Sequence, residues 1–298
     1  MTSQTVFSVE IPGPLTALGG VEGLGFIKTR YANYSDDYPD FEIHMVTGGP
    51  SSDDGQTFRR VQGFSREMWE KVYKPYLAHD AFSMYPVLLR PKSKGFIKLR
   101  TTNAYDPPII DPRYLTHPDD ILAVVDAMKI SIALGFAPVF KKFGTQLFQH
   151  HFPGCEIYAL WSDEYLACVA RTYTSTIYHP TGTCRMGAKH DKRAVVDPQF
   201  RVLGGISGLR VVDGSIMPNI VSGNTNAPII MLGERCADFI KGQTLPPVRH
   251  SPRLERRLSF SSHDGDSFSG LTNFKLVEDV MTHLVEDAKK RRRRSTTG

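Results

Sequence analysis

The spacing of apolar and polar residues predicts strands in the first part of the chain. Residues 41–46 alternate between apolar and polar side chains, which is typical of a half-buried strand and places His44 on the polar face in a structural role. Residues 82–89 and 96–99 predict two further strands, and we expect them to form part of an antiparallel sheet. Residues 1–35 combine glycine and proline with short apolar patches, so we expect irregular structure there.

Three other segments have the 3.6-residue spacing of helices. Residues 65–77, 116–135 and 162–171 each begin with polar residues that can cap a helix. The apolar stripe within 116–135 is the most regular of the three and ends at a glycine. Its regularity indicates a helix that packs in a core.

Composition and charge are those of an ordinary globular protein, with one exception at the C-terminal end. The 298 residues are 41% hydrophobic and 22% charged, with a formal net charge of +5. Residues 245–298 hold 11 Lys and Arg against 7 Asp and Glu, which leaves 25 basic and 24 acidic residues in 1–244. A nearly neutral body gives no indication of nucleic-acid binding. We find no apolar run of the roughly 20 residues that a membrane span needs and no readable signal peptide, so the localisation stays open.

The four cysteines, Cys155, Cys168, Cys184 and Cys236, show neither CxxC pairs nor histidines at zinc spacing. We therefore expect no metal site. A disulfide, for example between Cys155 and Cys168, would fit a secreted protein. Buried free thiols are the interpretation that we favour.

The composition changes after residue 245. Residues 245–271 are expected to be disordered, and 256–259 resemble a basophilic kinase site. Residues 276–288 predict an amphipathic helix. Residues 289–294 follow it with six consecutive positive charges. A solvated helix end is the simplest interpretation of this run. Nuclear targeting, or contact with an acidic membrane surface or partner, is the alternative.

One ordered series of motifs carries the chemical information. It comprises Tyr-His-Pro-Thr-Gly-Thr-Cys-Arg-Met-Gly at 178–187, Val-Val-Asp-Pro at 195–198, Leu-Arg-Val-Val-Asp at 209–213, Gly-Ser-Ile-Met-Pro at 214–218 and Ser-Gly-Asn-Thr-Asn-Ala-Pro at 222–228. Further similarity lies in 13–23 and 88–95. In this order the motifs resemble the C-terminal signature of the glucose-methanol-choline (GMC) flavoprotein oxidoreductases, and in particular their insect glucose dehydrogenase-like members. The resemblance extends over most of residues 10–242.

The resemblance implies an α+β fold and three parts. Residues 1–177 would form a substrate-side domain with a mainly antiparallel sheet and helices. Residues 178–244 would carry the GMC C-terminal signature and return to an FAD-binding α/β domain, with a strand at 209–213 and a helix at about 228–240. Residues 245–298 lie outside the resemblance, and their composition predicts a disordered basic tail with a short amphipathic helix.

The resemblance also implies a reaction, the oxidation of a CH–OH group of an alcohol or sugar, with FAD as cofactor and either quinone or oxygen as electron acceptor. His179 would be the catalytic base, and Asn224 the second catalytic residue, whose amide can donate to a developing alkoxide. Asp213, Gly214, Asn224, Thr225 and Asn226 would contact the cofactor. The alternative for Asn224 and Asn226 is that they cap the following helix.

The sequence departs from the family in one respect. Nothing in residues 1–298 fits the Gly-x-Gly-x-x-Gly unit that cradles the FAD pyrophosphate, because Gly20, Gly23 and Gly25 have the wrong spacing and context. We therefore expect the N-terminal βαβ unit to be missing and this chain alone to be incomplete and inactive. The second hypothesis is a truncated, non-catalytic fragment whose only activity is binding through its C-terminal tail.

Overall fold

The computed structural model of the chain describes residues 20–243 and 274–295, apart from positions 37, 53, 56, 57 and 78. The chain forms two compact units. The described part of unit 1 comprises residues 20–93, 114–175 and 274–295, and that of unit 2 comprises 94–113 and 176–243. Helices and small antiparallel sheets confirm the α+β class. The predicted domain limits at 177 and 244 stay a prediction.

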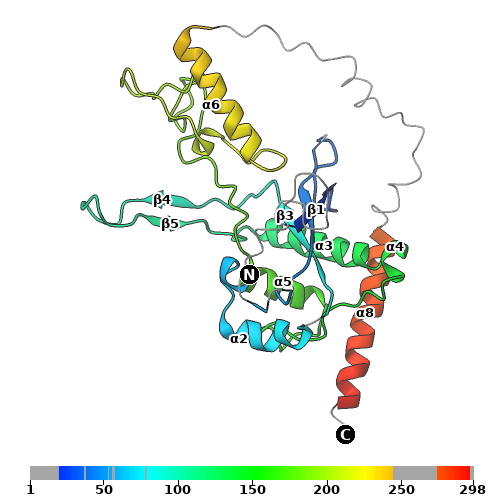
Figure 1. Cartoon of the computed structure of the whole chain (residues 1–298). Helices are drawn as coiled ribbons and strands as arrows, with labels where there is room; N and C mark the ends of the chain where they lie inside the picture. The colour runs from blue at the N-terminus through cyan, green and yellow to red at the C-terminus, as the bar shows by residue number, and fades with distance from the viewer. Residues whose placement is uncertain are drawn as a thin grey trace, which may run out of the picture. The chain divides into compact units, whose positions relative to one another are not determined.

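The sheet of unit 1 has three antiparallel strands in the order β1 (Val21–Ile27), β2 (Phe41–Thr47) and β3 (Phe82–Leu88) (Figure 1). The prediction of irregular structure over 1–35 is wrong at β1, which pairs with β2 despite its two glycines. The strand at 41–46 is confirmed, but it lies in the centre of the sheet rather than half exposed. His44 is consequently buried, with its Nε2 atom 3.5 Å from Oε1 of the fully buried Glu42.

The strands predicted at 82–89 and 96–99 exist but belong to two different sheets. β3 pairs with β2, whereas β4 (Phe96–Lys98) pairs with β5 (Ile109–Asp111) in a separate hairpin of unit 2. At Gly95, which precedes the hairpin, a Cβ atom would lie 2.2 Å from the carbonyl oxygen of Asp111. Only glycine fits this close approach of two backbone segments.

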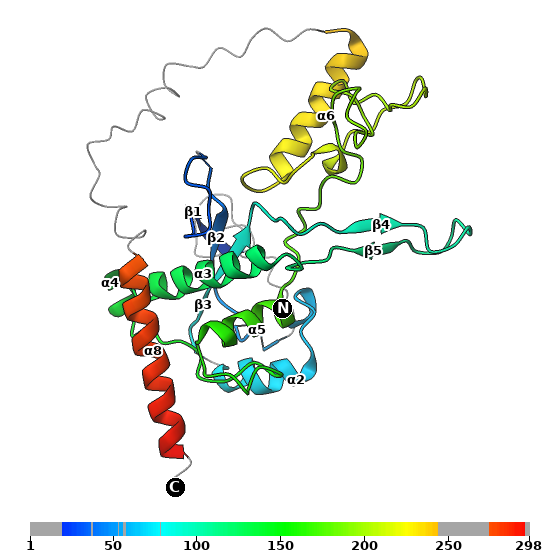
Figure 2. The same ribbon diagram turned by 180° about the vertical axis from the view of Figure 1, so that it is seen from behind.

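Helices α3 (Pro118–Gly135) and α5 (Asp163–Tyr173) confirm two of the predicted helices. Ser162 caps α5 through its hydroxyl, as expected, whereas the cap of α3 is His117, whose Nδ1 atom accepts from the backbone of Asp119. α3 packs against β3 and α5, and the views from both sides show it lying beside the sheet (Figures 1 and 2). The buried residues of the resulting core are Ile43, Val125, Ile130, Cys155, Leu160, Tyr165, Leu166, Val277 and Met281.

The short helical segments of unit 1 lie between β2 and β3 and after α3. They are α1 (Phe58–Val61), α2 (Arg66–Met68), a π-helix (Trp69–Tyr73), a 3₁₀ turn (Lys74–Tyr76) and, after α3, α4 (Pro138–Lys141). The helix predicted at 65–77 is confirmed as a continuous run of α, π and 3₁₀ turns, and the hydroxyl of Ser65 caps it. It buries one face, centred on Met68 and Val72, in a second cluster.

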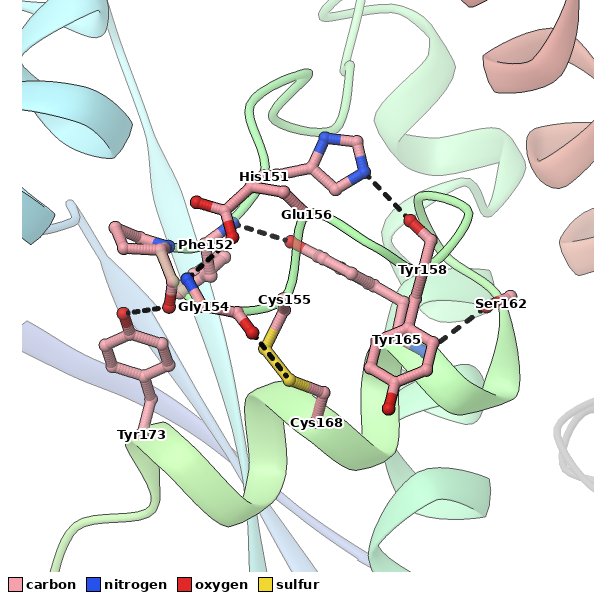
Figure 3. Close-up of a disulfide and its surroundings, with 11 residues drawn as sticks. His151, Phe152, Gly154, Cys155, Glu156, Tyr158, Ser162, Tyr165, Cys168 and Tyr173 are labelled. Atoms are coloured by element: carbon pink, nitrogen blue, oxygen red, sulfur yellow. Dashed lines mark hydrogen bonds between the residues drawn. A yellow bond between two sulfur atoms is a disulfide. The ribbon is translucent and has the colours of Figure 1, made fainter.

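Cys155 and Cys168 form a disulfide, which corrects our preference for free thiols at these positions. The loop before α5 folds back onto the helix, so that the two Cα atoms lie 5.9 Å apart, within the range for a disulfide. Figure 3 shows the loop held further by the hydroxyl of Tyr173, which donates to the carbonyl of Pro153, and by the backbone of Phe152, which donates to the hydroxyl of Tyr165. Spacing alone could not predict this return of the loop.

The predicted C-terminal helix is present as α8 (Phe274–Ser295) and packs against α3. Its residues Val277 and Met281 are buried in the core of unit 1, and Glu278 forms an ion pair with Arg30 at 3.1 Å. The disorder expected over 245–271 and the kinase-like motif at 256–259 lie outside the described residues. Among the described residues, no helix is long and apolar enough to cross a membrane.

Unit 2 contains little regular structure. Besides the β4–β5 hairpin it has the 3₁₀ turn η5 (Gly214–Ile216) and the helix α6 (Asn226–Lys241), which begins two residues before the predicted helix (Figure 1). The strand predicted at 209–213 is wrong: Arg210 forms a single isolated bridge with Arg201. The buried core consists of Val196, Phe200, Ile216, Met217, Leu232 and Cys236.

Candidate active site

The backbone around His179 is constrained on both sides. Tyr178, immediately before it, has a φ of +62°, a left-handed conformation that is uncommon for a bulky residue. The backbone N–H of Tyr178 donates to the hydroxyl of Thr176 at 3.0 Å. Pro180, immediately after it, fixes its own φ and favours an extended conformation at His179. The imidazole is thus carried by a stiff loop, as the sequence predicted.

Gly214 brings the turn at 213–216 against this loop. A Cβ atom at Gly214 would lie 3.3 Å from the carbonyl oxygen of Pro180 and 3.3 Å from Cδ1 of Ile229 on α6. The carboxylate of Asp213 caps the turn by accepting from the backbone of Ser215 at 2.8 Å. Three segments far apart in sequence therefore meet at one glycine: the His179 loop, the 213–216 turn and the first turns of α6.

Backbone hydrogen bonds fix the downstream part of the loop to the same turn. The N–H of Cys184 donates to the carbonyl of Ser215 at 3.0 Å, and the N–H of Met186 donates to that of Ile216 at 2.7 Å. This pairing explains why the motifs at 178–187 and 214–218 occur together. The side chain of Cys184 is a partly exposed free thiol, and its packing role stays a prediction.

The start of α6 supplies the remaining predicted residues. Thr225 is the N-cap position and is buried, but its side chain makes no capping hydrogen bond, and Asn226 is already the first residue of the helix. The alternative that Asn226 caps the helix is therefore wrong, because Asn226 lies inside it. The first backbone N–H groups of a helix lack intrahelical partners, and the helix dipole places partial positive charge there.

Asn224 directs its side chain at His179. The Nδ2 atom of Asn224 lies 3.5 Å from Nε2 of His179, across 45 positions of sequence. In the imidazole tautomer with the proton on Nδ1, Nε2 accepts from the amide NH₂ group of Asn224. The two residues predicted to be catalytic are thus in contact.

Charged residues of unit 2 form hydrogen bonds that stabilise its turns. The carboxylate of Asp197 is buried, yet hydrogen bonds from Arg201 and from the backbone of Gln199 lower its pKa. Hydrogen bonds from Arg193 lower the pKa of Asp191 in a neighbouring turn. In the part of the chain that the structure describes, no group of acidic, histidine or cysteine residues is arranged to hold a metal ion.

Sequence reasoning missed the geometry on the N-terminal side of His179. Neither the left-handed backbone of Tyr178 nor its bond to Thr176 was predicted. A threonine two positions before a residue can form such a turn, but this local signal is weak without the observed conformation. Gly182 is a second special position, because its φ of +89° is a backbone conformation that residues with a Cβ atom rarely adopt.

Residues 91–233 match the family model described as GMC oxidoreductase, C-terminal domain. The glucose dehydrogenase [FAD, quinone] of Drosophila melanogaster is 37% identical over 218 residues, which cover 72% of this chain and 32% of that protein. Human mitochondrial choline dehydrogenase is 42% identical over 164 residues, covering 55% of this chain and 26% of that protein. A solved structure of Aspergillus oryzae RIB40 formate oxidase superposes with a TM-score of 0.53 at 27% identity, covering 69% of this chain and 32% of the other.

The chain therefore belongs to the GMC oxidoreductases, and residues 91–233 correspond to their C-terminal domain. It is similar to insect glucose dehydrogenases over 54% to 72% of its own length but spans only 26% to 32% of theirs.

Proposed function

We propose that this chain provides the substrate-side base of an FAD-dependent oxidoreductase that acts on the CH–OH group of an alcohol or sugar. One observation carries the proposal, the 3.5 Å contact between Nδ2 of Asn224 and Nε2 of His179. A general base needs an unprotonated nitrogen, and a developing alkoxide needs a neutral donor beside that base. The pair supplies both.

On binding, the substrate hydroxyl would replace the Asn224 amide at the single lone pair of Nε2, where His179 would accept the hydroxyl proton. Asn224 would then donate its hydrogen bond to the substrate oxygen as negative charge develops. Histidine suits the first role because it changes protonation state near neutral pH. Asparagine suits the second role because its amide does not titrate. The fixed backbone at Tyr178 and Pro180 would keep the imidazole oriented without a cost of reorganisation.

The residues present fit one edge of a flavin. Gly214 lets the 213–216 turn pack closely against the His179 loop and the start of α6, and the first N–H groups of α6 favour a group that gains negative charge. Asp213, Gly214, Asn224, Thr225 and Asn226 are the residues that would hold FAD. When bound, FAD supplies the hydride acceptor, which is chemistry that a protein only positions.

The names of the relatives support an alcohol or sugar as substrate. Glucose dehydrogenase, choline dehydrogenase and an alcohol dehydrogenase [acceptor] of Pseudomonas putida are all named for molecules that carry a CH–OH group. Quinone appears in the printed name of the insect enzymes, and oxygen in that of a choline dehydrogenase of Rhizobium johnstonii. Both acceptors therefore stay candidates for the complete protein.

The second hypothesis, binding through the C-terminal tail, has no observation in its favour. Val277 and Met281 of α8 are used within the core of unit 1, so this part of the predicted apolar stripe is already covered. A role for the basic run at 289–294 stays a prediction.

The decisive experiment uses a GMC polypeptide in which residues 1–298 follow a complete FAD-binding segment. We expect His179→Ala to slow anaerobic flavin reduction by an alcohol or sugar at least about 100-fold, the usual contribution of a general base. The matched control is His190→Ala, because His190 is an exposed histidine of the same unit. Unchanged reduction in His179→Ala, with the flavin still bound, would contradict the proposal.

A further inference from the structure

Asn33, Tyr34 and Ser35 form an acceptor motif for asparagine-linked glycosylation. The motif is Asn-x-Ser with a residue other than proline in the middle, and no other asparagine of the 298 residues has serine or threonine two positions later. A motif of this length also occurs by chance, so its meaning depends on its place in the fold. It lies in the connection between β1 and β2, where all three residues are exposed.

The turn leaves the reactive groups of the motif available. Oδ1 of Asn33 accepts from the backbone N–H of Ser35 at 3.1 Å, which is the geometry of an Asx-turn. The backbone N–H of Asp36 donates to the carbonyl of Asn33, also at 3.1 Å. Among the described residues, neither Nδ2 of Asn33 nor the hydroxyl of Ser35 forms a hydrogen bond. A sugar on Nδ2 would therefore break no bond of the fold.

The base of this connection is fixed, although its tip is exposed. The backbone N–H and the hydroxyl of Thr29 donate to the buried carboxylate of Asp40 at 2.9 and 2.5 Å. Nearer the tip, Nζ of Lys28 donates to the carbonyl of Asp36 at 2.5 Å. A bulky polar group on Asn33 would thus be carried by an ordered turn at the surface and would displace no buried side chain.

The disulfide between Cys155 and Cys168 indicates the compartment independently of the motif. Disulfides form in the lumen of the endoplasmic reticulum and outside the cell, and they are rare in the cytosol. Glycans are transferred to asparagine in that same lumen, and they are typical of surface loops of secreted proteins. Two features that lie more than 100 positions apart therefore indicate one route of synthesis.

We propose that the complete protein passes through the secretory pathway and carries an N-linked glycan on Asn33. The donor is an oligosaccharide linked to a lipid diphosphate. A bond forms between Nδ2 of Asn33 and the anomeric carbon of the first sugar, the bond from that carbon to the diphosphate breaks, and the amide loses one proton. The lipid diphosphate is the leaving group. This proposal is independent of the proposed function, because it uses no residue of the candidate active site.

The test expresses the full chain, residues 1–298, behind a cleavable secretion leader in mammalian cells. The chain from the lumen and the medium is analysed by electrophoresis and peptide mass before and after treatment with peptide:N-glycosidase F. We expect one shift in mobility that the enzyme removes, with conversion of the Asn33 amide to a carboxylate. Asn33→Gln and Ser35→Ala should lose the shift, whereas Ser35→Thr, which keeps the hydroxyl, should retain it.

Asn103 is a matched control in an exposed turn. Its Oδ1 accepts from the backbone N–H of Tyr105 at 3.1 Å, so the Asx-turn is the same, but a tyrosine stands where the motif requires a hydroxyl of serine or threonine. Its Nδ2 donates to Asp106 at 3.1 Å. Asn103→Gln should therefore leave the shift unchanged. A lumenal chain with the disulfide formed but Asn33 unmodified would overturn the proposal, and so would a shift that persists in Ser35→Ala.

A second measurement tests whether the folded turn accommodates the glycan. The glycosylated chain should unfold at the same temperature as Asn33→Gln or at a higher one, because Nδ2 has no role in the fold among the described residues. A glycosylated chain that unfolds more than about 4 °C below Asn33→Gln would show that the turn cannot bear the modification, and would overturn the assignment of Asn33 as a glycan site.

Discussion

The two units of this chain are stabilised in different ways. The described part of unit 1 has a three-stranded sheet, the three helices α3, α5 and α8, and a core shared among sheet, helices and a disulfide-linked loop. Unit 2 contains one long helix, a hairpin and many turns, with a core of six buried residues. The catalytic candidates, His179 and Asn224, lie in unit 2. Binding and catalytic residues often lie on loops that a rigid scaffold positions, and here glycines and hydrogen-bonded turns replace much of that scaffold.

The two kinds of stabilisation predict different responses to a substitution in each unit. The stability of unit 1 depends little on the direction of any one side chain, because many apolar contacts contribute to its core. In unit 2 the loop that carries His179 meets the 213–216 turn at Gly214, and the imidazole itself contacts Asn224. A small change at either contact should therefore affect the site more than it affects the fold.

Removal of the disulfide should produce the largest change in stability. We expect the double substitution Cys155→Ala and Cys168→Ala to lower the free energy of unfolding of unit 1 by about 3 kcal/mol, because a loop of this length is no longer closed in the unfolded state. Thermal unfolding with and without a reducing agent measures the effect.

The controls come from unit 2, whose two cysteines are free. Cys184→Ala should show the same response to reductant as the unsubstituted chain. Alkylation of the unreduced, unfolded chain should label two thiols rather than four. Labelling of all four, or an unfolding temperature independent of reductant, would contradict the role given to the disulfide.

The elements of unit 1 were largely predictable, because their apolar spacing repeats over several turns or along a whole strand. α3 and α5 follow such stripes, and β2 follows an alternating pattern. β1 was missed because its glycines suggested irregular structure, while its pairing with β2 depends on residues about 20 positions away. The burial of His44 was missed for the same reason, since a local pattern does not show a strand's neighbours.

A second, smaller effect should appear in unit 2 when Asp197 loses its charge. Its carboxylate accepts from the guanidinium and backbone of Arg201 and from the backbone of Gln199. We expect Asp197→Ala to destabilise unit 2 by about 2 kcal/mol, the range for hydrogen bonds to a charged group. Gln199→Ala, which removes only an exposed side chain, should change stability by less than about 0.5 kcal/mol.

The same carboxylate gives a pH dependence with a definite sign. The pKa of Asp197 is lowered in the folded chain, so its contribution is fully present above the unfolded value of about 4 and is lost as the pH falls through the lower folded value. Unfolding of unit 2 followed between neutral and strongly acid pH should show this loss. A pH dependence that is equally steep in Asp197→Asn would contradict the assignment.

The candidate site was predictable only in part. The ordered motifs located His179 and Asn224, and the structure places them in contact. The strand predicted at 209–213 was wrong because the apolar pair Val211 and Val212 also suits the turns that pack on a small core. The left-handed Tyr178 could not be predicted, since tyrosine gives no signal for that conformation and it depends on contacts on both sides of the loop.

The measurement that tests the central claim most directly is a double-substitution cycle at His179 and Asn224, read as anaerobic flavin reduction in the FAD-containing polypeptide. If both residues act on one substrate oxygen, Asn224→Ala should lower the rate at least about tenfold when His179 is present and hardly at all in His179→Ala. That difference corresponds to a coupling of about 1.4 kcal/mol between the two side chains. Effects that simply multiply in the double variant would show two independent residues and would contradict a shared site.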